Sequence, residues 1–166
     1  MLKSTLLPET LPEVDSDRIG CIGHSLGGHN TLFTAAFDVR ILAVVTSCGF
    51  TAFHSYYEGD LAGWTSDRYM PRIRDEYGNG PDRVPFDFHE GLAAIAPRSI
   101  FINAPVSDSN FDVNGVRKVI AESEKAFAVY GGVGARLQVR YPDSGHDFPV
   151  EIRAEAYQWL EEQLQQ

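Results

Sequence analysis

The sequence predicts an α/β fold in which a parallel sheet of about four strands is flanked by helices. Four short apolar runs have the length of strands, and helical patterns separate most of them; the runs cover residues 18–23, 41–47, 99–104 and 136–141. The second run is almost unbroken in its apolar character, as in parallel strands that are covered on both faces. Strands that alternate with helices are joined by right-handed crossovers, which makes neighbouring strands parallel. The last run alternates polar and apolar residues, so we expect it at a sheet edge.

Helices are expected at residues 30–37, 114–130 and 150–164. The second has apolar residues at helical spacing and a stop signal at Gly131-Gly132. The third carries glutamates on its polar face and apolar residues on the other. Residues 49–97 break the alternation and are too long for a simple connection. We expect this aromatic-rich stretch to be an insertion of short helices over the end of the sheet, within a single domain spanning residues 1–166.

Composition narrows the class of protein. The chain has 166 residues, a net charge of −9 and 43% hydrophobic residues, which fits one globular domain. The negative charge argues against nucleic acid or an anionic membrane as the main partner. No run approaches the roughly 20 apolar residues that span a bilayer. Met1–Leu7 does not resemble a signal peptide, because Pro8 interrupts it. We therefore expect a soluble, cytoplasmic protein, although a missing N-terminal segment would hide an export signal.

The sharpest motif is Gly23-His24-Ser25-Leu26-Gly27, which lies between a predicted strand and a predicted helix. This context is typical of a nucleophile elbow, whose sharp turn lifts a serine hydroxyl above the sheet. Ser25 is then the nucleophile, and the backbone N–H of Leu26 at the helix N-terminus can stabilise an oxyanion. The alternative is a glycine-rich turn of another α/β fold, with Ser25 as a helix cap.

A serine nucleophile needs a general base and an orienting acid. In folds with a nucleophile elbow of this kind, the order along the chain is serine, acid, histidine. Asp108 stands a few residues after the third strand, and His146 lies in the turn-rich loop before the last helix. The other interpretations are that Asp108 forms an Asx-type turn and that His146 is an ordinary surface residue. Asp112 is the reserve candidate for the acid.

Other residues are candidates for substrate binding rather than for chemistry. His24 fills the variable position before Ser25, and Trp64, Tyr69 and Arg72 of the insertion could line a pocket, although packing of the aromatics in a core is the role that we favour. No metal site is predicted, since His-x-x-x-His and Cys-x-x-Cys patterns are lacking. Cys21 and Cys48, each in or at the end of an apolar run, are expected to be buried free thiols.

With these residues in this order, the chain resembles the α/β-hydrolase superfamily and, within it, the dienelactone-hydrolase-like and acetyl-esterase-like branch. The resemblance runs from about Pro12 to Leu160 and is carried by residues 18–28, 93–98 (Ala-Ala-Ile-Ala-Pro-Arg) and 144–147 (Ser-Gly-His-Asp). It implies hydrolysis of carboxylic esters through an acyl-enzyme intermediate, without a cofactor. In that mechanism Ser25 attacks, His146 relays the proton and Asp108 orients His146.

One departure from the superfamily is large. Several strands and a second oxyanion-hole loop normally precede the elbow, whereas residues 1–17 precede it here. The chain therefore resembles the C-terminal half of an α/β-hydrolase fold, and Leu26 is the one oxyanion donor that can be named. The strand that bears Ser25 would have an open edge. The chain could be a fragment, a natural short form or a homodimer; our hypothesis is a homodimer paired through this edge.

Three functions are consistent with these residues. The first is a serine esterase that acts on a small-molecule ester. The second is a non-catalytic or weakly active α/β-hydrolase-like module that serves in binding. The third is peptidase or lactonase activity on the same three residues, which the sequence does not separate from esterase activity. We favour the esterase, because Ser25, Asp108 and His146 occur in the expected order.

Overall fold

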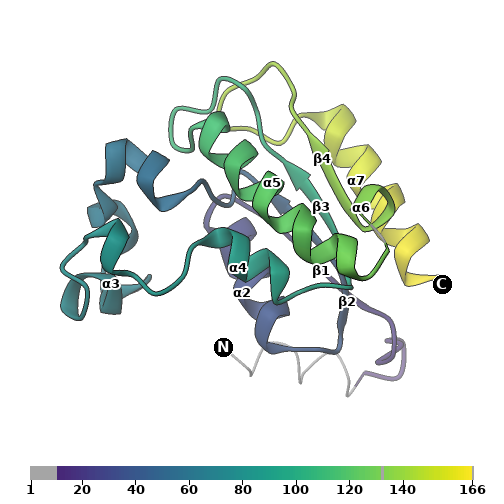
Figure 1. Cartoon of the computed structure of the whole chain (residues 1–166). Helices are drawn as coiled ribbons and strands as arrows, with labels where there is room; N and C mark the ends of the chain where they lie inside the picture. The colour runs from purple at the N-terminus through teal and green to yellow at the C-terminus, as the bar shows by residue number, and fades with distance from the viewer. Residues whose placement is uncertain (1–10, 132, 166) are drawn as a thin grey trace.

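A single sheet of four parallel strands forms the centre of the structure, a computed structural model that describes residues 11–131 and 133–165. The strands are β1 (Ile19–His24), β2 (Ile41–Ser47), β3 (Ser99–Asn103) and β4 (Leu137–Arg140), and they lie side by side in sequence order (Figure 1). The predicted α/β class and the parallel sheet are confirmed. The alternating last run does form an edge strand, β4, as its pattern predicts.

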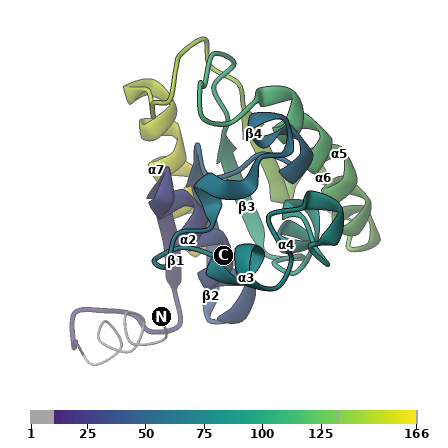
Figure 2. The ribbon, with the colours of Figure 1, turned by 90° about the vertical axis from the view of Figure 1, so that its left-hand side faces the viewer.

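Helices cover both faces of the sheet. On one face lie α2 (Leu26–Phe37), α4 (Phe88–Ala93) and α5 (Val113–Val129), while α7 (Val150–Leu164) covers the other face, as Figure 2 shows. Neighbouring strand residues alternate between the two layers, because successive side chains of a strand point to opposite faces. Val44 belongs to the core that includes Leu32 of α2, whereas Val45 belongs to the core that includes Trp159 of α7. This two-sided burial explains why β2 is apolar almost throughout.

The stretch between β2 and β3 consists mostly of short helices at the left of Figure 1. Their bounds are η2 (Phe53–Gly59), η3 (Leu61–Trp64), α3 (Pro71–Asp75) and η4 (Pro81–Arg83), followed by α4. Its largest side chains are buried and join the main core rather than forming a separate one: Phe53, Trp64 and Phe88 are each at most 2% exposed and pack with Leu32 of α2.

Arg98, at the end of the 93–98 segment, has a structural role. Its guanidinium donates hydrogen bonds to the carbonyl oxygens of Ala35 (2.8 Å), Asp38 (3.0 Å) and Ile41 (2.9 Å). The first two lie at the C-terminal end of α2, where backbone carbonyls lack partners in the helix and a positive charge is favourable. Arg98 therefore fixes the end of α2 to the start of β2, which helps to hold the whole β1–α2–β2 unit.

Some boundaries differ from the prediction. Helix α2 begins at Leu26, four residues before its predicted start at residue 30, and Arg136 ends a short helix, α6 (Val133–Arg136), instead of starting β4. Met1–Leu7 and Gly132, which entered the predictions of an export signal and of a helix stop, lie outside the described residues. Within residues 11–131 and 133–165, no helix combines the length and the apolar character that crossing a bilayer requires.

Candidate active site

The turn between β1 and α2 is strained at Ser25. Its backbone has φ 54° and ψ −121°, a positive φ that costs a non-glycine residue about 1–3 kcal/mol and is often found at functional sites. The surroundings hold this conformation: the Ser25 N–H donates to the Ser47 carbonyl at 2.8 Å, and the Ser25 carbonyl accepts from the His29 N–H at 3.0 Å. This is the strand–turn–helix geometry that the sequence motif predicts.

Close packing at the elbow requires two of its glycines. A Cβ on Gly23 would lie 2.3 Å from the backbone of Gly27, and one on Gly28 would lie 2.8 Å from the Ser47 carbonyl oxygen. Gly23 thus allows the chain to reverse sharply, and Gly28 allows α2 to approach the end of β2. Gly27 differs, because an added Cβ there would meet nothing within 4 Å. The second glycine of the motif is therefore not needed for space.

Ser25, His146 and Asp108 form one chain of hydrogen bonds. The Oγ of Ser25 lies 2.8 Å from Nε2 of His146, and Nδ1 of the same ring lies 3.0 and 2.9 Å from the two carboxylate oxygens of Asp108. The three residues come from the loops after β1, β3 and β4, and the latter two loops lie together at the top of Figure 1. The geometry fits Nδ1–H donating to Asp108, which leaves Nε2 as an acceptor for the serine hydroxyl.

Asp108 is held rigidly in this position. Its side chain is 2% exposed, and its Oδ1 accepts from the backbone N–H groups of Asn110 (2.8 Å) and Phe111 (3.2 Å). The Asx-type turn that the sequence offered as an alternative is therefore formed, and it coexists with the bond to His146. The reserve acid, Asp112, lies elsewhere: it caps α5 by accepting from the Asn114 N–H at 3.0 Å.

A buried polar network lies beneath the His146 loop, and sequence reasoning did not find it. Asn103, at the end of β3, is 1% exposed, and its amide donates to Ser47 Oγ (2.8 Å) and to the Asp147 carbonyl (2.9 Å). The Cys48 thiol donates to the same carbonyl at 3.3 Å. The backbone next to His146 is thus tied to the ends of both β2 and β3. The one sequence signal for this network was Asn103 itself, a polar residue at the end of the otherwise apolar third run.

The two cysteines are free, as expected; Cys48 is buried and Cys21 is half-buried. Burial and the nearby negative charge of Asp108 raise the pKa of the Cys48 thiol to about 12. At neutral pH Cys48 therefore stays protonated and acts as a hydrogen-bond donor rather than as a nucleophile.

His24 lies against the loop that carries His146, next to His146 and Phe148. Its Nδ1 lies 2.9 Å from Ser47 Oγ, and its ring lies 5.1 Å from the ring of His146. Partial burial, followed by the charge of His146, lowers the pKa of His24, against the opposing effect of Asp147 and Asp108. His24 lines a separate hollow with Phe148, so the structure does not bring it to the cavity beside Ser25.

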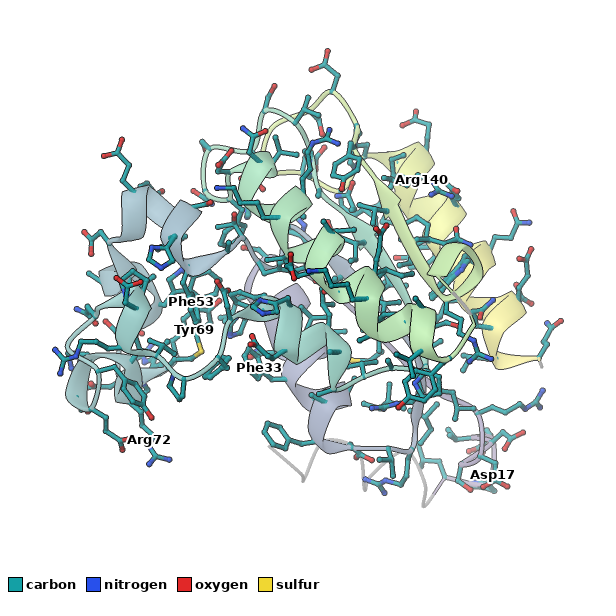
Figure 3. The ribbon with its side chains drawn as sticks, in the orientation of Figure 1. Asp17, Phe33, Phe53, Tyr69, Arg72 and Arg140 are labelled. Atoms are coloured by element: carbon teal, nitrogen blue, oxygen red, sulfur yellow. The ribbon has the colours of Figure 1, made fainter. Side chains whose placement is uncertain are left out.

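A cavity of about 350 Å³ opens beside Ser25. Its wall includes both Trp64 and Tyr69, and the side chain of Leu26, which is 52% exposed. Trp64 is 1% exposed and stacks on Tyr69 with ring centroids 5.5 Å apart, so these aromatics also pack in a core. Arg72 bonds to Glu76 and points outward, away from the sheet (Figure 3).

His29 is a second buried polar group near the cavity that the sequence did not single out. It is 3% exposed and lies against the rings of Tyr69 (4.6 Å), Phe33 (4.7 Å) and Trp64 (4.9 Å). Burial lowers the pKa of His29 to about 4, and a hydrogen bond with the Gly49 backbone opposes this effect. His29 is therefore neutral at physiological pH.

One group of potential metal ligands occurs within the described residues. Cys48, Asp108 and His146 place their ligand atoms within 4.8 Å of one another. However, Asp108 and His146 already bond to each other, His146 also bonds to Ser25, and the Cys48 thiol donates to the Asp147 carbonyl. These residues do not fit a metal site.

The two-sided parallel sheet and a serine at a strained strand–helix turn define the class of the protein: it has an α/β-hydrolase fold, as the sequence resemblance implies. A sequence model described as "Glucuronyl esterase, fungi" matches residues 5–134. The chain therefore belongs to the glucuronyl esterase family.

Individual relatives agree with this assignment. Carbohydrate esterase MZ0003, from an unknown prokaryotic organism, is 26% identical over 137 residues, which cover 76% of this chain and 30% of the relative. YtaP of Bacillus subtilis (strain 168), a hydrolase by name, is 32% identical over 157 residues, or 92% of this chain and 48% of the relative. The chain thus spans less than half the length of either relative.

Solved structures share the fold. A glucuronoyl esterase of carbohydrate esterase family 15 from Caldicellulosiruptor kristjansonii superposes with a TM-score of 0.74 at 23% identity. The superposition covers 96% of this chain and 46% of that one. It is consistent with the predicted half of an α/β-hydrolase fold.

Proposed function

We propose that this chain carries the catalytic serine, histidine and aspartate of a carboxylic-ester hydrolase that works through an acyl-enzyme intermediate. The observation that carries the proposal is the unbroken hydrogen-bonded chain from Ser25 Oγ through His146 to Asp108, with a serine–histidine distance of 2.8 Å. This is the arrangement of nucleophile, general base and orienting acid that activates a serine hydroxyl at neutral pH.

In the acylation step, Ser25 Oγ attacks the ester carbonyl carbon while Nε2 of His146 takes the hydroxyl proton. Asp108 stabilises the imidazolium that forms and keeps Nδ1 protonated. The tetrahedral intermediate then collapses: the carbon–oxygen bond of the leaving alcohol breaks, and the alcohol oxygen receives the proton from His146. The acyl group remains on Ser25.

The oxyanion of the tetrahedral intermediate needs a hydrogen-bond donor to stabilise its negative charge. We propose the backbone N–H of Leu26, because it lies at the N-terminus of α2, where N–H groups lack helical partners and the helix dipole favours an anion. The N–H of Ser25 is unsuited, since it already donates to the Ser47 carbonyl at 2.8 Å.

Deacylation reverses the roles. Water attacks the acyl carbonyl while His146 Nε2 takes a proton from it, and the second intermediate collapses as His146 returns that proton to Ser25 Oγ. The products are a carboxylic acid and an alcohol, and His146 and Ser25 regain their starting protonation states. No cofactor takes part in either step.

We propose an ester of a carbohydrate as the substrate. Two relatives are named as a carbohydrate esterase and a glucuronoyl esterase, and the cavity beside Ser25 is walled by the aromatic side chains of Tyr56, Trp64, Tyr69 and Phe111. Aromatic faces suit the apolar C–H faces of sugar rings, and they supply rigid contact area.

Hydrolysis of para-nitrophenyl acetate tests the proposed chemistry. We expect turnover by the wild-type chain and none above background by Ser25→Ala. Ser16→Ala, which removes an exposed hydroxyl before β1, is the matched control and should retain turnover. Equal rates for the wild-type chain and Ser25→Ala would refute the esterase proposal and favour a non-catalytic binding module.

We further propose that β1 pairs with a second copy of the chain. Within residues 11–131 and 133–165, β1 pairs on one side only, with β2, and its Ile22 is 37% exposed. An open strand edge in this position recruits another strand. Light scattering should give the mass of a dimer at micromolar concentration; the mass of a monomer would disprove this pairing.

A further inference from the structure

Arg68 lines the cavity beside Ser25 and has no carboxylate partner within the described residues. The two arginines of the neighbouring helix α3, in contrast, both form ion pairs. Arg72 pairs with Glu76 at 2.7 Å, and Arg74 pairs with both Asp67 (3.0 Å) and Asp75 (2.8 Å). Acidic side chains are thus plentiful nearby, and they are engaged by neighbouring arginines while Arg68 is left without one.

The rest of the cavity wall has no charge. The described residues that line it beside Arg68 are aromatic, aliphatic, serine or glycine, with no aspartate or glutamate among them. This is notable in a chain with a net charge of −9. A lone cation in a hollow with an apolar wall gives a local positive potential that attracts anions, whatever the sign of the total charge.

We propose that Arg68 makes this site selective for esters that carry a carboxylate group besides the ester bond. The planar guanidinium matches a carboxylate in a two-hydrogen-bond arrangement, which a lysine ammonium does not reproduce. The substrate then lies in the cavity with its carboxylate at Arg68 and its ester carbonyl at Ser25, against the wall that includes Trp64 and Tyr69. The inference rests on the proposed function for the hydrolytic step but not for the binding of the anion.

The binding of the anion is measured without turnover, in Ser25→Ala. The probe pair is phenylacetate and its neutral counterpart phenylacetamide, followed by the fluorescence of the tryptophans, of which Trp64 lies in the wall. We expect phenylacetate to bind about 5- to 10-fold more tightly, the range for a charge-assisted contact that is partly screened by solvent. Adding Arg68→Ala should abolish the difference, whereas Arg68→Lys should restore part of it.

Arg72→Ala is the matched control, because it removes an exposed arginine of the same segment that lies outside the cavity and pairs with Glu76. It should leave the preference for phenylacetate unchanged. Equal binding of the two probes, or a preference that survives Arg68→Ala, would overturn the inference.

Turnover then identifies which part of the substrate carries the anion. The acyl side is tested by the ratio of kcat/KM for mono-para-nitrophenyl succinate to that for para-nitrophenyl acetate. The alcohol side is tested by the ratio for para-acetoxybenzoate to that for phenyl acetate. We expect Arg68→Ala to lower one of these ratios about 5- to 10-fold, and a change in neither would overturn the selectivity. Anion binding that depends on Arg68 without turnover of any ester would refute the proposed function and leave the anion site in place.

Discussion

The Nε2 atom of His146 lies 2.8 Å from the Oγ of Ser25, although 121 positions of the sequence separate the two residues. The sheet accounts for this meeting. All four strands are parallel, so their carboxyl ends share one edge, and the loops that follow β1 and β4 both lie there. Asp108 lies in the loop after β3 at the same edge, and its carboxylate bonds to Nδ1 of His146.

The first prediction concerns Asp108. Asp108→Asn should lower kcat by about ten-thousand-fold, the loss seen when a triad aspartate becomes an amide, because the amide favours the wrong tautomer of the histidine. Steady-state kinetics on para-nitrophenyl acetate measure it. Asp112→Asn is the control, since asparagine caps a helix as well as aspartate does and Asp112 lies at the start of α5. A larger loss of kcat in Asp112→Asn than in Asp108→Asn would show that Asp108 is not the orienting acid.

The second prediction concerns Asn103 as a positioning residue. Asn103→Leu removes the hydrogen bonds to Ser47 Oγ and to the Asp147 carbonyl, so the His146 loop should lose its alignment with Ser25. We expect kcat to fall by about 10- to 100-fold, in keeping with the sensitivity of catalysis to small misplacements, with a much smaller change in KM.

A purely structural role for Asn103 would give a different result. Thermal unfolding of the same variant separates the two, because leaving a buried acceptor without its donor costs about 1–3 kcal/mol. If the folded fraction of Asn103→Leu at the assay temperature accounts for its lost activity, and kcat per folded molecule is unchanged, the positioning role is wrong.

The third prediction compares two glycines of the elbow. Gly23→Ala would place its Cβ 2.3 Å from the Gly27 backbone, so it should destabilise the fold by several kcal/mol or prevent it, as overpacking does. Gly27→Ala meets nothing within 4 Å and lies in α2, so it should be neutral or stabilise by about 0.5–1 kcal/mol. Chemical denaturation of both variants checks this order, and an equal loss of stability in the two would contradict the close approach at Gly23.

The fourth prediction concerns His29 and acid. The pKa of His29 is about 4 in the folded chain against an ordinary value of 6.5, so the unfolded chain takes up this proton first as the pH falls. Stability should therefore be lost between pH 6.5 and 4, by about 1.4 kcal/mol for each pH unit. Tyr69, the ionisable ring stacked on His29, stays neutral throughout, because a phenol ionises only well above this range and burial raises the pKa of Tyr69 further.

The variant His29→Leu isolates this effect, because leucine takes up no proton in either state. The free energy of unfolding of the wild-type chain minus that of His29→Leu should fall steadily from pH 6.5 to 4, because only the wild-type chain loses stability through this histidine. A difference that stays constant with pH would show that His29 is protonated equally in the folded and unfolded chains.

Local patterns predicted much of the fold. Strand β2 and helix α7 have the bounds that their apolar patterns predict, Ile41–Ser47 and Val150–Leu164. The apolar residues of β2 are mostly buried, and α7 turns Ala156 and Trp159 into the core, so the pattern reports burial directly. The start of α2 was predicted too late, because Gly27-Gly28 disfavours a helix locally, whereas in the fold Gly28 lets the first turn of α2 pack closely against the end of β2.

The residues of the candidate site that occur in a motif or in a fixed order along the chain could be predicted from the sequence. Those that depend on long-range contacts could not. Ser25, Asp108 and His146 follow from a motif and its order along the chain. By contrast, Asn103 reaches a carbonyl 44 positions away, and the burial of His29 depends on Trp64 and Tyr69, which come from a distant segment. No local pattern encodes these pairings.

Covalent labelling tests the central claim, that Ser25 is an activated nucleophile, most directly. The chain is treated with a fluorophosphonate, and the adduct is located by peptide mass spectrometry. The account predicts a single adduct on Ser25 that is absent from Ser25→Ala and forms far more slowly in His146→Ala. No adduct on the folded wild-type chain, or labelling of a different residue at the same rate in Ser25→Ala, would contradict it.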